Sequence, residues 1–174
     1  MKQPPRILLF TGDGKGKTTA ALGLAFRAIG CGMKVCVIQF IKSAPAGEVQ
    51  TAKAVPGMVF IGTGLGFLPP KDDPSFVRHR AAVMAGLEKA SQAIASGRFE
   101  MVVLDEICVA VNRGFLQEPH VIELLRRAPS HMVLVLTGRG ATEGLVQLAD
   151  TVTEMHCVKH ALAAGWQAQK GVEL

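Results

Sequence analysis

The residues best suited to chemistry form a glycine-rich segment near the N-terminus. Residues 11–18 read Thr-Gly-Asp-Gly-Lys-Gly-Lys-Thr, which matches the phosphate-loop pattern G-x-x-x-x-G-K-[ST] except that Thr11 stands in place of the first glycine. An apolar run precedes the segment and an Ala- and Leu-rich run follows it, as in a strand–loop–helix unit. A plain glycine turn is the alternative, but such a turn does not require the Lys-Thr pair. The segment therefore predicts binding of a nucleoside triphosphate with magnesium.

Each residue type in this segment has a chemical reason to be there. Gly12, Gly14 and Gly16 allow a tight turn whose N–H groups point at phosphate oxygens. Lys17 supplies positive charge to the phosphates, and Thr18 offers its hydroxyl to magnesium. A helix that begins near Lys17 adds the positive end of its dipole. The predicted phosphate-binding residues are Gly12, Asp13, Gly14, Lys15, Gly16, Lys17, Thr18 and Thr19.

An acidic pair, Asp105 and Glu106, follows a second apolar run at 101–104. In a P-loop protein a carboxylate at the end of such a strand holds magnesium, directly or through water. A solvated pair of acids is the alternative, and the spacing does not decide which of the two would bind the metal. Arg139 follows another apolar run and could reach a triphosphate, although a lone arginine is more often a surface charge.

These residues need a scaffold, and the sequence predicts alternating strands and helices. Short continuous apolar runs are typical of strands buried on both faces, and Ala- and Leu-rich runs ended by glycine are typical of helices. Segment 45–55 is predicted as a loop or a short helix, and 62–74 as a long loop rich in Gly and Pro. The expected strands are 7–10, 35–41, 58–61, 101–104, 132–136 and 151–158, and the expected helices are 18–31, 75–96, 119–127 and 142–149.

Strands that alternate with helices indicate a parallel sheet covered on both faces. Together with the phosphate loop, this pattern predicts an α/β fold: a P-loop NTPase (RecA-like) three-layer sandwich with a mainly parallel central sheet. The length of 174 residues fits a single nucleotide-binding domain over 1–174. Ligands of such sheets bind beyond the carboxyl ends of the strands, where the phosphate loop and the acidic pair both fall.

The composition of the chain predicts which classes of partner it binds and in which cellular compartment it lies. The formal net charge of +5 suits a polyphosphate or another anion. No nucleic-acid partner is expected, because the basic residues are scattered and aromatic residues make up only 5% of the chain. No apolar run approaches the roughly 20 residues of a membrane span, so we expect a cytoplasmic protein without a membrane partner. The four cysteines are expected to be free thiols, mostly buried: Cys31, Cys36, Cys108 and Cys157.

The motifs together resemble those of the ATP:corrinoid adenosyltransferases of the cobalamin-assembly type, which act on cob(I)alamin or cob(I)yrinic acid a,c-diamide. They occur in family order over nearly the whole chain, and GKGKTT, TGRGA and VKH…AQKG are more specific than a generic phosphate loop. A threonine at the position of Thr11 is ordinary in this family. The matching segments are TGDGKGKTTAALGLAFRAIGCGMKV, VIQFIKS, MVVLDEI, LTGRGA and ADTVTEMHCVKHALAAGWQAQKGVEL.

This resemblance implies a reaction and roles for particular residues. The cobalt(I) of a corrinoid would attack the ribose 5′-carbon of ATP and displace triphosphate, as a step of adenosylcobalamin biosynthesis. The protein would then be an enzyme with ATP as co-substrate, Mg²⁺ or Mn²⁺ as cofactor and no covalent catalytic residue. Thr18 and Glu106 would hold the metal, with Asp105 as a further candidate. Arg27 and Arg139 would join the loop in binding the triphosphate.

The resemblance is weaker in the segment that would contact the corrinoid. Several relatives carry a Gly-x-Gly-Phe-x-Trp segment whose aromatic residues press on the lower face of the corrinoid. The corresponding stretch here, 62–73, reads GTGLGFLPPKDD, with Phe67 as the counterpart and no Trp. Phe67 and His160 are the candidate corrinoid contacts, and the tail 160–174 is expected to form part of the site wall. Which corrinoid is preferred, and how its axial base is displaced, stay open.

Two other functions also stay open. A P-loop ATPase or small-molecule kinase would need a base near the terminal phosphate, for which only Asp105 or Glu106 could serve. A nucleotide- or corrinoid-binding protein without turnover is the other alternative. The products separate the three functions: adenosyl transfer gives triphosphate, phosphoryl transfer gives ADP, and a binding protein gives neither.

The resemblance further implies two kinds of partner. One is a flavoprotein-type reductant that supplies cobalt(I), and the other is a second copy of the chain in a homodimer.

Overall fold

Six short segments form the strands of one parallel sheet in the computed structural model, which describes residues 4–43 and 47–172. The strand order is β3-β2-β4-β5-β1-β6, and every pairing is parallel. The inner strands β2 and β4 are buried along their whole length, which explains their uninterrupted apolar sequences. The strands are β1 (Arg6–Thr11), β2 (Val35–Gln39), β3 (Met58–Gly62), β4 (Met101–Asp105), β5 (Val133–Thr137) and β6 (Thr151–Glu154).

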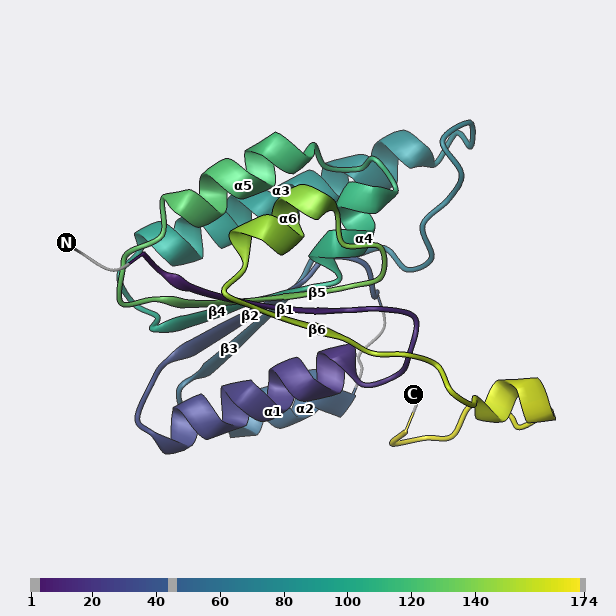
Figure 1. Ribbon diagram of the computed structural model, residues 1–174, viewed down its shortest axis with the longest axis horizontal. Helices are drawn as coiled ribbons and strands as arrows, with labels where there is room; N and C mark the ends of the chain where they lie inside the picture. The colour runs from purple at the N-terminus through teal and green to yellow at the C-terminus, as the bar shows by residue number, and fades with distance from the viewer. Residues whose placement is uncertain (1–3, 44–46, 173–174) are drawn as a thin grey trace.

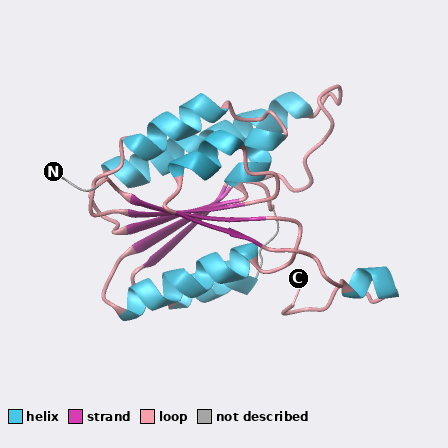
Figure 2. Cartoon of the chain, viewed as in Figure 1, coloured by secondary structure: helices cyan, strands magenta, loops and turns pink. Residues whose placement is uncertain are grey.

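Helices cover both faces of the sheet and complete three layers, as Figure 1 and the colouring of Figure 2 show. One face carries α1 (Lys17–Gly30) and α2 (Gly47–Ala54). The other face carries α3 (Phe76–Ala95), α4 (Ile107–Asn112), α5 (Glu118–Arg126) and α6 (Glu143–Leu148). The predicted α/β sandwich is therefore confirmed.

The helix after the phosphate loop is fixed to the sheet by a stripe of small residues. Ala21, Ala25 and Ala28 are buried at helical spacing and pack in one core cluster with Val35 and Val103. Because alanine side chains are small, they allow α1 to pack close to the strands. This packing holds the N-terminus of α1 against the carboxyl edge of the sheet.

The strand order determines which residues meet at that edge. Strand β5 lies between β1, which leads into the phosphate loop, and β4, which ends in Asp105. In the registers, Phe10 lies beside Thr137 and Leu104 lies beside Leu136. The phosphate loop, the end of β5 and the acidic pair therefore follow one another along the carboxyl edge.

Several predicted boundaries were wrong or incomplete. The last strand ends at Glu154 rather than at 158, because the chain leaves the sheet there and the Met155 carbonyl accepts the N–H of Gly14 at 2.7 Å. Helix α4 was not predicted, since its short apolar sequence ICVAVN, which follows the acidic pair, does not distinguish a helix from a strand. A 3-10 helix at Ala161–Ala164 was also missed. Segment 45–55 contains helix α2, while residues 44–46 lie outside the described residues.

The cysteine prediction was half right. All four thiols are free, but Cys31 and Cys157 are exposed, whereas Cys36 and Cys108 are buried. Burial raises the pKa of Cys36 to about 11 and that of Cys108 to about 12. Over the described residues, no helix has the length and apolar character needed to cross a membrane.

Candidate active site

The phosphate loop joins β1 to α1 and curls around its own lysine. Gly12 and Gly16 have φ angles of 90° and 119°, in the left-handed region that favours glycine. The Lys17 side chain is buried, with 8% exposure, and its Nζ donates to the carbonyls of Gly12 at 2.8 Å and Gly14 at 2.6 Å. Desolvation lowers the Lys17 pKa, and the nearby Arg139 lowers it further. The loop thus presents a buried cation at the N-terminus of a helix.

The segment after β6 packs directly on this loop. The Gly14 N–H donates to the Met155 carbonyl, and a Cβ on Gly14 would lie 2.8 Å from the backbone oxygens of both Met155 and His156. A Cβ on Gly12 would also collide with Met155. Glycine is therefore required here for close approach of two backbones as well as for the turn.

We predict that Gly14→Ala destabilises the protein by about 1–3 kcal/mol and weakens ATP binding, because the new methyl group forces Met155 and His156 off the loop. Gly23→Ala is the matched control, since Gly23 lies within α1 with no atom near the added Cβ. The control should raise stability by up to about 1 kcal/mol through helix propensity. Thermal melts of both variants check this, and equal stability of the two variants would contradict it.

Thr11, where the general pattern has glycine, has a structural role. It is the last residue of β1, and its Oγ1 accepts the N–H of Ala141 at 3.3 Å. This bond ties the start of the phosphate loop to the segment that follows β5. The departure from the general pattern therefore connects two parts of the candidate site.

Asp105 is almost completely buried, with 1% exposure, and its carboxylate accepts three hydrogen bonds. Its Oδ1 accepts from the Thr18 hydroxyl at 2.8 Å and from the Thr137 hydroxyl at 2.7 Å. Its Oδ2 accepts from Gln39 Nε2 at 2.9 Å. Buried carboxylates require such partners, and here the partners link the phosphate loop to β2, β4 and β5.

Glu106 has a different environment, although it is the next residue. Its φ of 66° is the only positive value among the described non-glycine residues, and it turns the chain from β4 into α4. Among the described residues none donates a hydrogen bond to its carboxylate. Burial raises the Glu106 pKa and Asp105 adds to the increase, whereas Lys17, Lys42 and Arg139 oppose it. Three cations from different segments therefore favour the charged form of this carboxylate.

The donor set suits magnesium. The Thr18 hydroxyl and the carboxylates of Asp105 and Glu106 are hard oxygen ligands, which Mg²⁺ prefers. Within the described residues no group of three or more His, Cys, Asp or Glu side chains could hold a metal ion. Mg²⁺ is commonly bound by one or two carboxylates together with phosphate oxygens and water.

The remaining predicted residues are spread more widely. Lys15 is exposed, and its Nζ donates to the Val172 carbonyl in the tail at 2.6 Å. Arg27 lies in the last turn of α1, about 15 Å along the helix from Lys17, so the structure does not bring it to the loop of the same chain. Phe67 is 100% exposed. His160 caps the N-terminus of the 3-10 helix, where its Nδ1 accepts the Leu162 N–H at 3.2 Å.

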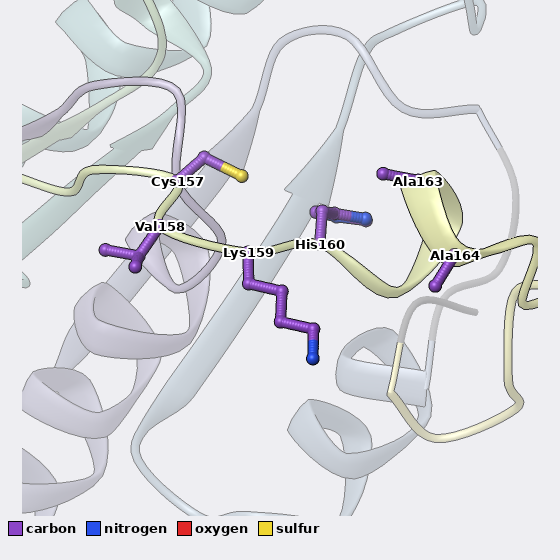
Figure 3. Close-up of a pocket in the computed structure, with 6 residues that line it drawn as sticks. All are labelled: Cys157, Val158, Lys159, His160, Ala163 and Ala164. Atoms are coloured by element: carbon purple, nitrogen blue, oxygen red, sulfur yellow. The ribbon is translucent and has the colours of Figure 1, made fainter.

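Two open hollows lie at this edge. The larger, about 450 Å³, is formed by the tail after β6 (Figure 3). The smaller, about 310 Å³, lies beyond β2 and β3 and includes Gln39 and Lys42 in its wall. The residues around the larger hollow are Cys157, Val158, Lys159, His160, Ala163 and Ala164.

Sequence reasoning missed Gln39 and Thr137. Gln39 had a visible signal, since it is a polar residue at the end of the apolar run VCVIQ and is only 2% exposed. Thr137 begins the TGRGA motif, but nothing in the motif shows that its hydroxyl contacts both acidic residues. These contacts depend on strand order, which the sequence does not state.

Comparisons with known proteins bear on the fold and on the family. Solved structures of the flagellar accessory protein FlaH from Methanocaldococcus jannaschii and a KaiC-like protein from Pyrococcus horikoshii each match with a TM-score of 0.57. FlaH is 10% identical, over 88% of this chain and 72% of its own, and the KaiC-like protein is 15% identical, over 87% and 71%. At such low identity they show the fold alone, which agrees with the predicted α/β sandwich around a parallel sheet.

Sequence relatives identify the family. A corrinoid adenosyltransferase from Pseudomonas aeruginosa is 42% identical over 96% of this chain and 82% of its own length. Corrinoid adenosyltransferase CobA from Salmonella typhimurium is 40% identical over 96% and 84%, and a corrinoid adenosyltransferase from Escherichia coli K12 is 39% identical over the same shares. The profile of the family "ATP:corrinoid adenosyltransferase BtuR/CobO/CobP" matches residues 3–174. The chain belongs to this ATP:corrinoid adenosyltransferase family.

Proposed function

We propose that this chain transfers the 5′-deoxyadenosyl group of ATP to the cobalt(I) of a corrinoid and releases triphosphate, in adenosylcobalamin biosynthesis. Membership of a family of transferases supports the reaction class. The observation that carries the proposal is the phosphate loop, with its buried Lys17 beside the Thr18–Asp105 hydrogen bond. That arrangement suits a triphosphate that must be held as a leaving group.

The reaction needs little covalent chemistry from the protein. Cobalt(I) donates an electron pair to the 5′-carbon, a cobalt–carbon bond forms, and the carbon–oxygen bond breaks with its electron pair leaving on triphosphate. The protein must therefore align the two substrates and stabilise the charge of the leaving group. Loop residues 12–19 and Arg139 would bind the phosphates, and the influence of Arg139 on Lys17 and Glu106 supports its place beside them.

Magnesium fits the oxygen ligands at this site and, when bound, would neutralise charge on the triphosphate. We assign Glu106 and Thr18 as the residues that hold it. Asp105 would act mainly by accepting the Thr18 hydroxyl, because both of its carboxylate oxygens already have donors. This assignment separates the roles of two neighbouring carboxylates.

Product analysis separates this function from an ATPase or kinase and from a binding protein without turnover. Incubation with MgATP and a reduced corrinoid should yield triphosphate and a cobalt–carbon product in equal amounts. Release of ADP would support phosphoryl transfer instead. The absence of both products would leave a binding role.

Phe67 is the proposed contact for the lower face of the corrinoid, and its complete exposure leaves the ring available to a ligand. We predict that Phe67→Ala slows the reaction from cobalt(II) more than the reaction from pre-reduced cobalt(I), because only the first requires displacement of the axial base. Val77→Ala is a control, since Val77 is another exposed apolar residue. Anaerobic rates from both oxidation states provide the measurement, and equal losses would argue against a lower-face role.

The tail from 160 is proposed as part of the site wall. The Lys15–Val172 hydrogen bond brings the end of the described tail to the phosphate loop, and His160 contributes to the larger hollow (Figure 3). A single domain over 1–174 is consistent with this return of the tail. The preferred corrinoid, a flavoprotein-type reductant, a homodimer, a cytoplasmic location and the absence of a nucleic-acid partner remain predictions.

Thiol labelling tests the site wall with a control inside the same chain. At pH 8 the exposed Cys31 and Cys157 should react with iodoacetamide, while Cys36 and Cys108 stay protonated and buried. MgATP with a corrinoid should slow labelling of Cys157, which lines the larger hollow, but not of Cys31, at the far end of α1. Peptide mass spectrometry measures both rates, and equal protection or none would contradict the wall assignment.

A further inference from the structure

At the end of β5, one side chain forms hydrogen bonds with both acidic residues. Thr137 is the last residue of β5, between the strand of the phosphate loop and the strand of the acidic pair. Its side chain is completely buried. It therefore occupies a central position at the carboxyl edge without reaching solvent.

The Thr137 hydroxyl both accepts and donates a hydrogen bond. Its Oγ1 accepts the Glu106 N–H at 2.9 Å and donates to Asp105 Oδ1 at 2.7 Å. The first bond fixes the backbone of Glu106, the residue with φ of 66°, a conformation that disfavours any residue except glycine. The second bond fixes the carboxylate of Asp105. One hydroxyl thus sets the orientation of both acidic residues.

Gln39 holds the other side of Asp105. It ends β2, the strand on the far side of β4 from β5, and its side chain is buried. Its Nε2 donates to Asp105 Oδ2 at 2.9 Å. Since Oδ2 is occupied by Gln39, the carboxylate cannot rotate freely, and Oδ1 stays directed at the Thr18 hydroxyl. The carboxylate is thereby held between three donors from separate segments.

We propose that Thr137 and Gln39 are positioning residues that preset Thr18 and Glu106 for magnesium, an inference that rests on the proposed function. Both side chains are buried. Thr137 sets the backbone turn that presents the Glu106 carboxylate, and Gln39 with Thr137 orients Asp105 toward the Thr18 hydroxyl. Partners of this kind typically change metal affinity or activity by about 10- to 100-fold when they are removed.

The test is the magnesium dependence of ATP affinity, measured by calorimetry in Mg²⁺ and in EDTA. Thr137→Val keeps the shape of the side chain but removes both hydrogen bonds, whereas Thr137→Ser keeps the hydroxyl. Thr151→Val is the matched control, because Thr151 is exposed at the start of β6. We expect the Mg²⁺-dependent gain in affinity to fall about 10- to 100-fold in Thr137→Val. Thr137→Ser and Thr151→Val should match the wild type.

The outcomes separate this inference from the proposed function. An equal loss of affinity with and without Mg²⁺ would indicate a structural role and overturn the inference, as would an unchanged Thr137→Val. If the wild-type protein binds ATP with the same affinity in Mg²⁺ and in EDTA, both the proposed metal site and the inference are overturned. If Thr137→Val does not fold, Gln39→Met carries the test. It removes the donor to Asp105 Oδ2, and wild-type magnesium dependence in it would overturn the inference.

Discussion

Lys17→Ala is expected to abolish detectable ATP binding. Lys17 is the buried cation of the phosphate loop, and its Nζ donates to the carbonyls of Gly12 and Gly14. Loss of a buried, hydrogen-bonded charge contact typically costs about 2–5 kcal/mol, which is roughly 30- to 5000-fold in affinity. Calorimetric titration with MgATP measures the effect directly.

The control for Lys17→Ala is Lys89→Ala, which removes an exposed lysine from α3 on the opposite face of the sheet. The control should bind MgATP as the wild type does. A thermal melt of Lys17→Ala verifies that the loop variant is folded. Wild-type affinity in folded Lys17→Ala would contradict the assignment of the phosphate loop.

Glu106→Gln is expected to lower the rate of adenosyl transfer by about 10²- to 10³-fold, the loss typical of removing one group that stabilises developing charge. The substitution keeps the size of the side chain but removes the negative charge that Lys17, Lys42 and Arg139 stabilise. The metal would then lose its anionic protein ligand, and a higher Mg²⁺ concentration should recover part of the rate. Initial rates over a series of Mg²⁺ concentrations provide the measurement.

Two comparisons sharpen the Glu106 result. Glu88→Gln, on an exposed position of α3, should leave the rate unchanged. Asp105→Asn should lower thermal stability as well as rate, since it disturbs a carboxylate with three donors. A Glu106→Gln variant with a wild-type rate at every Mg²⁺ concentration would show that Glu106 does not hold the metal.

The sequence predicted the parts of the site that are continuous along the chain. The loop at 11–18 has a local pattern, so its strand–loop–helix context could be stated in advance, and the structure has it. The strand before Asp105 is a plain apolar run and was also predicted. Both predictions succeed because neighbouring residues alone determine them.

The rest of the site depends on contacts between distant segments. Gln39 and Asp105 are 66 residues apart, and Thr137 lies 32 residues beyond Asp105. Only the order of the strands brings them together, and hydrophobic patterning does not encode that order. The last strand is shorter than predicted because Met155 packs on Gly14, which lies far away in the sequence. Local propensity does not contain such a contact.

The sequence also could not assign separate roles to the two carboxylates. Asp105 and Glu106 are adjacent in sequence and alike in chemistry, so spacing alone left their roles open. The structure separates them by environment: Asp105 is hydrogen-bonded on both oxygens, whereas the pKa of Glu106 is raised by burial and lowered by three cations. Environment rather than residue type therefore distinguishes the proposed metal ligand from its neighbour.

The central claim is adenosyl transfer, and one anaerobic reaction tests it most directly. The protein is incubated with MgATP and chemically reduced cob(I)alamin, the visible spectrum is followed, and the phosphate products are separated. The proposed function predicts light-sensitive adenosylcobalamin together with an equal amount of triphosphate. Release of ADP without any cobalt–carbon product would contradict it and would support an ATPase with the same phosphate loop.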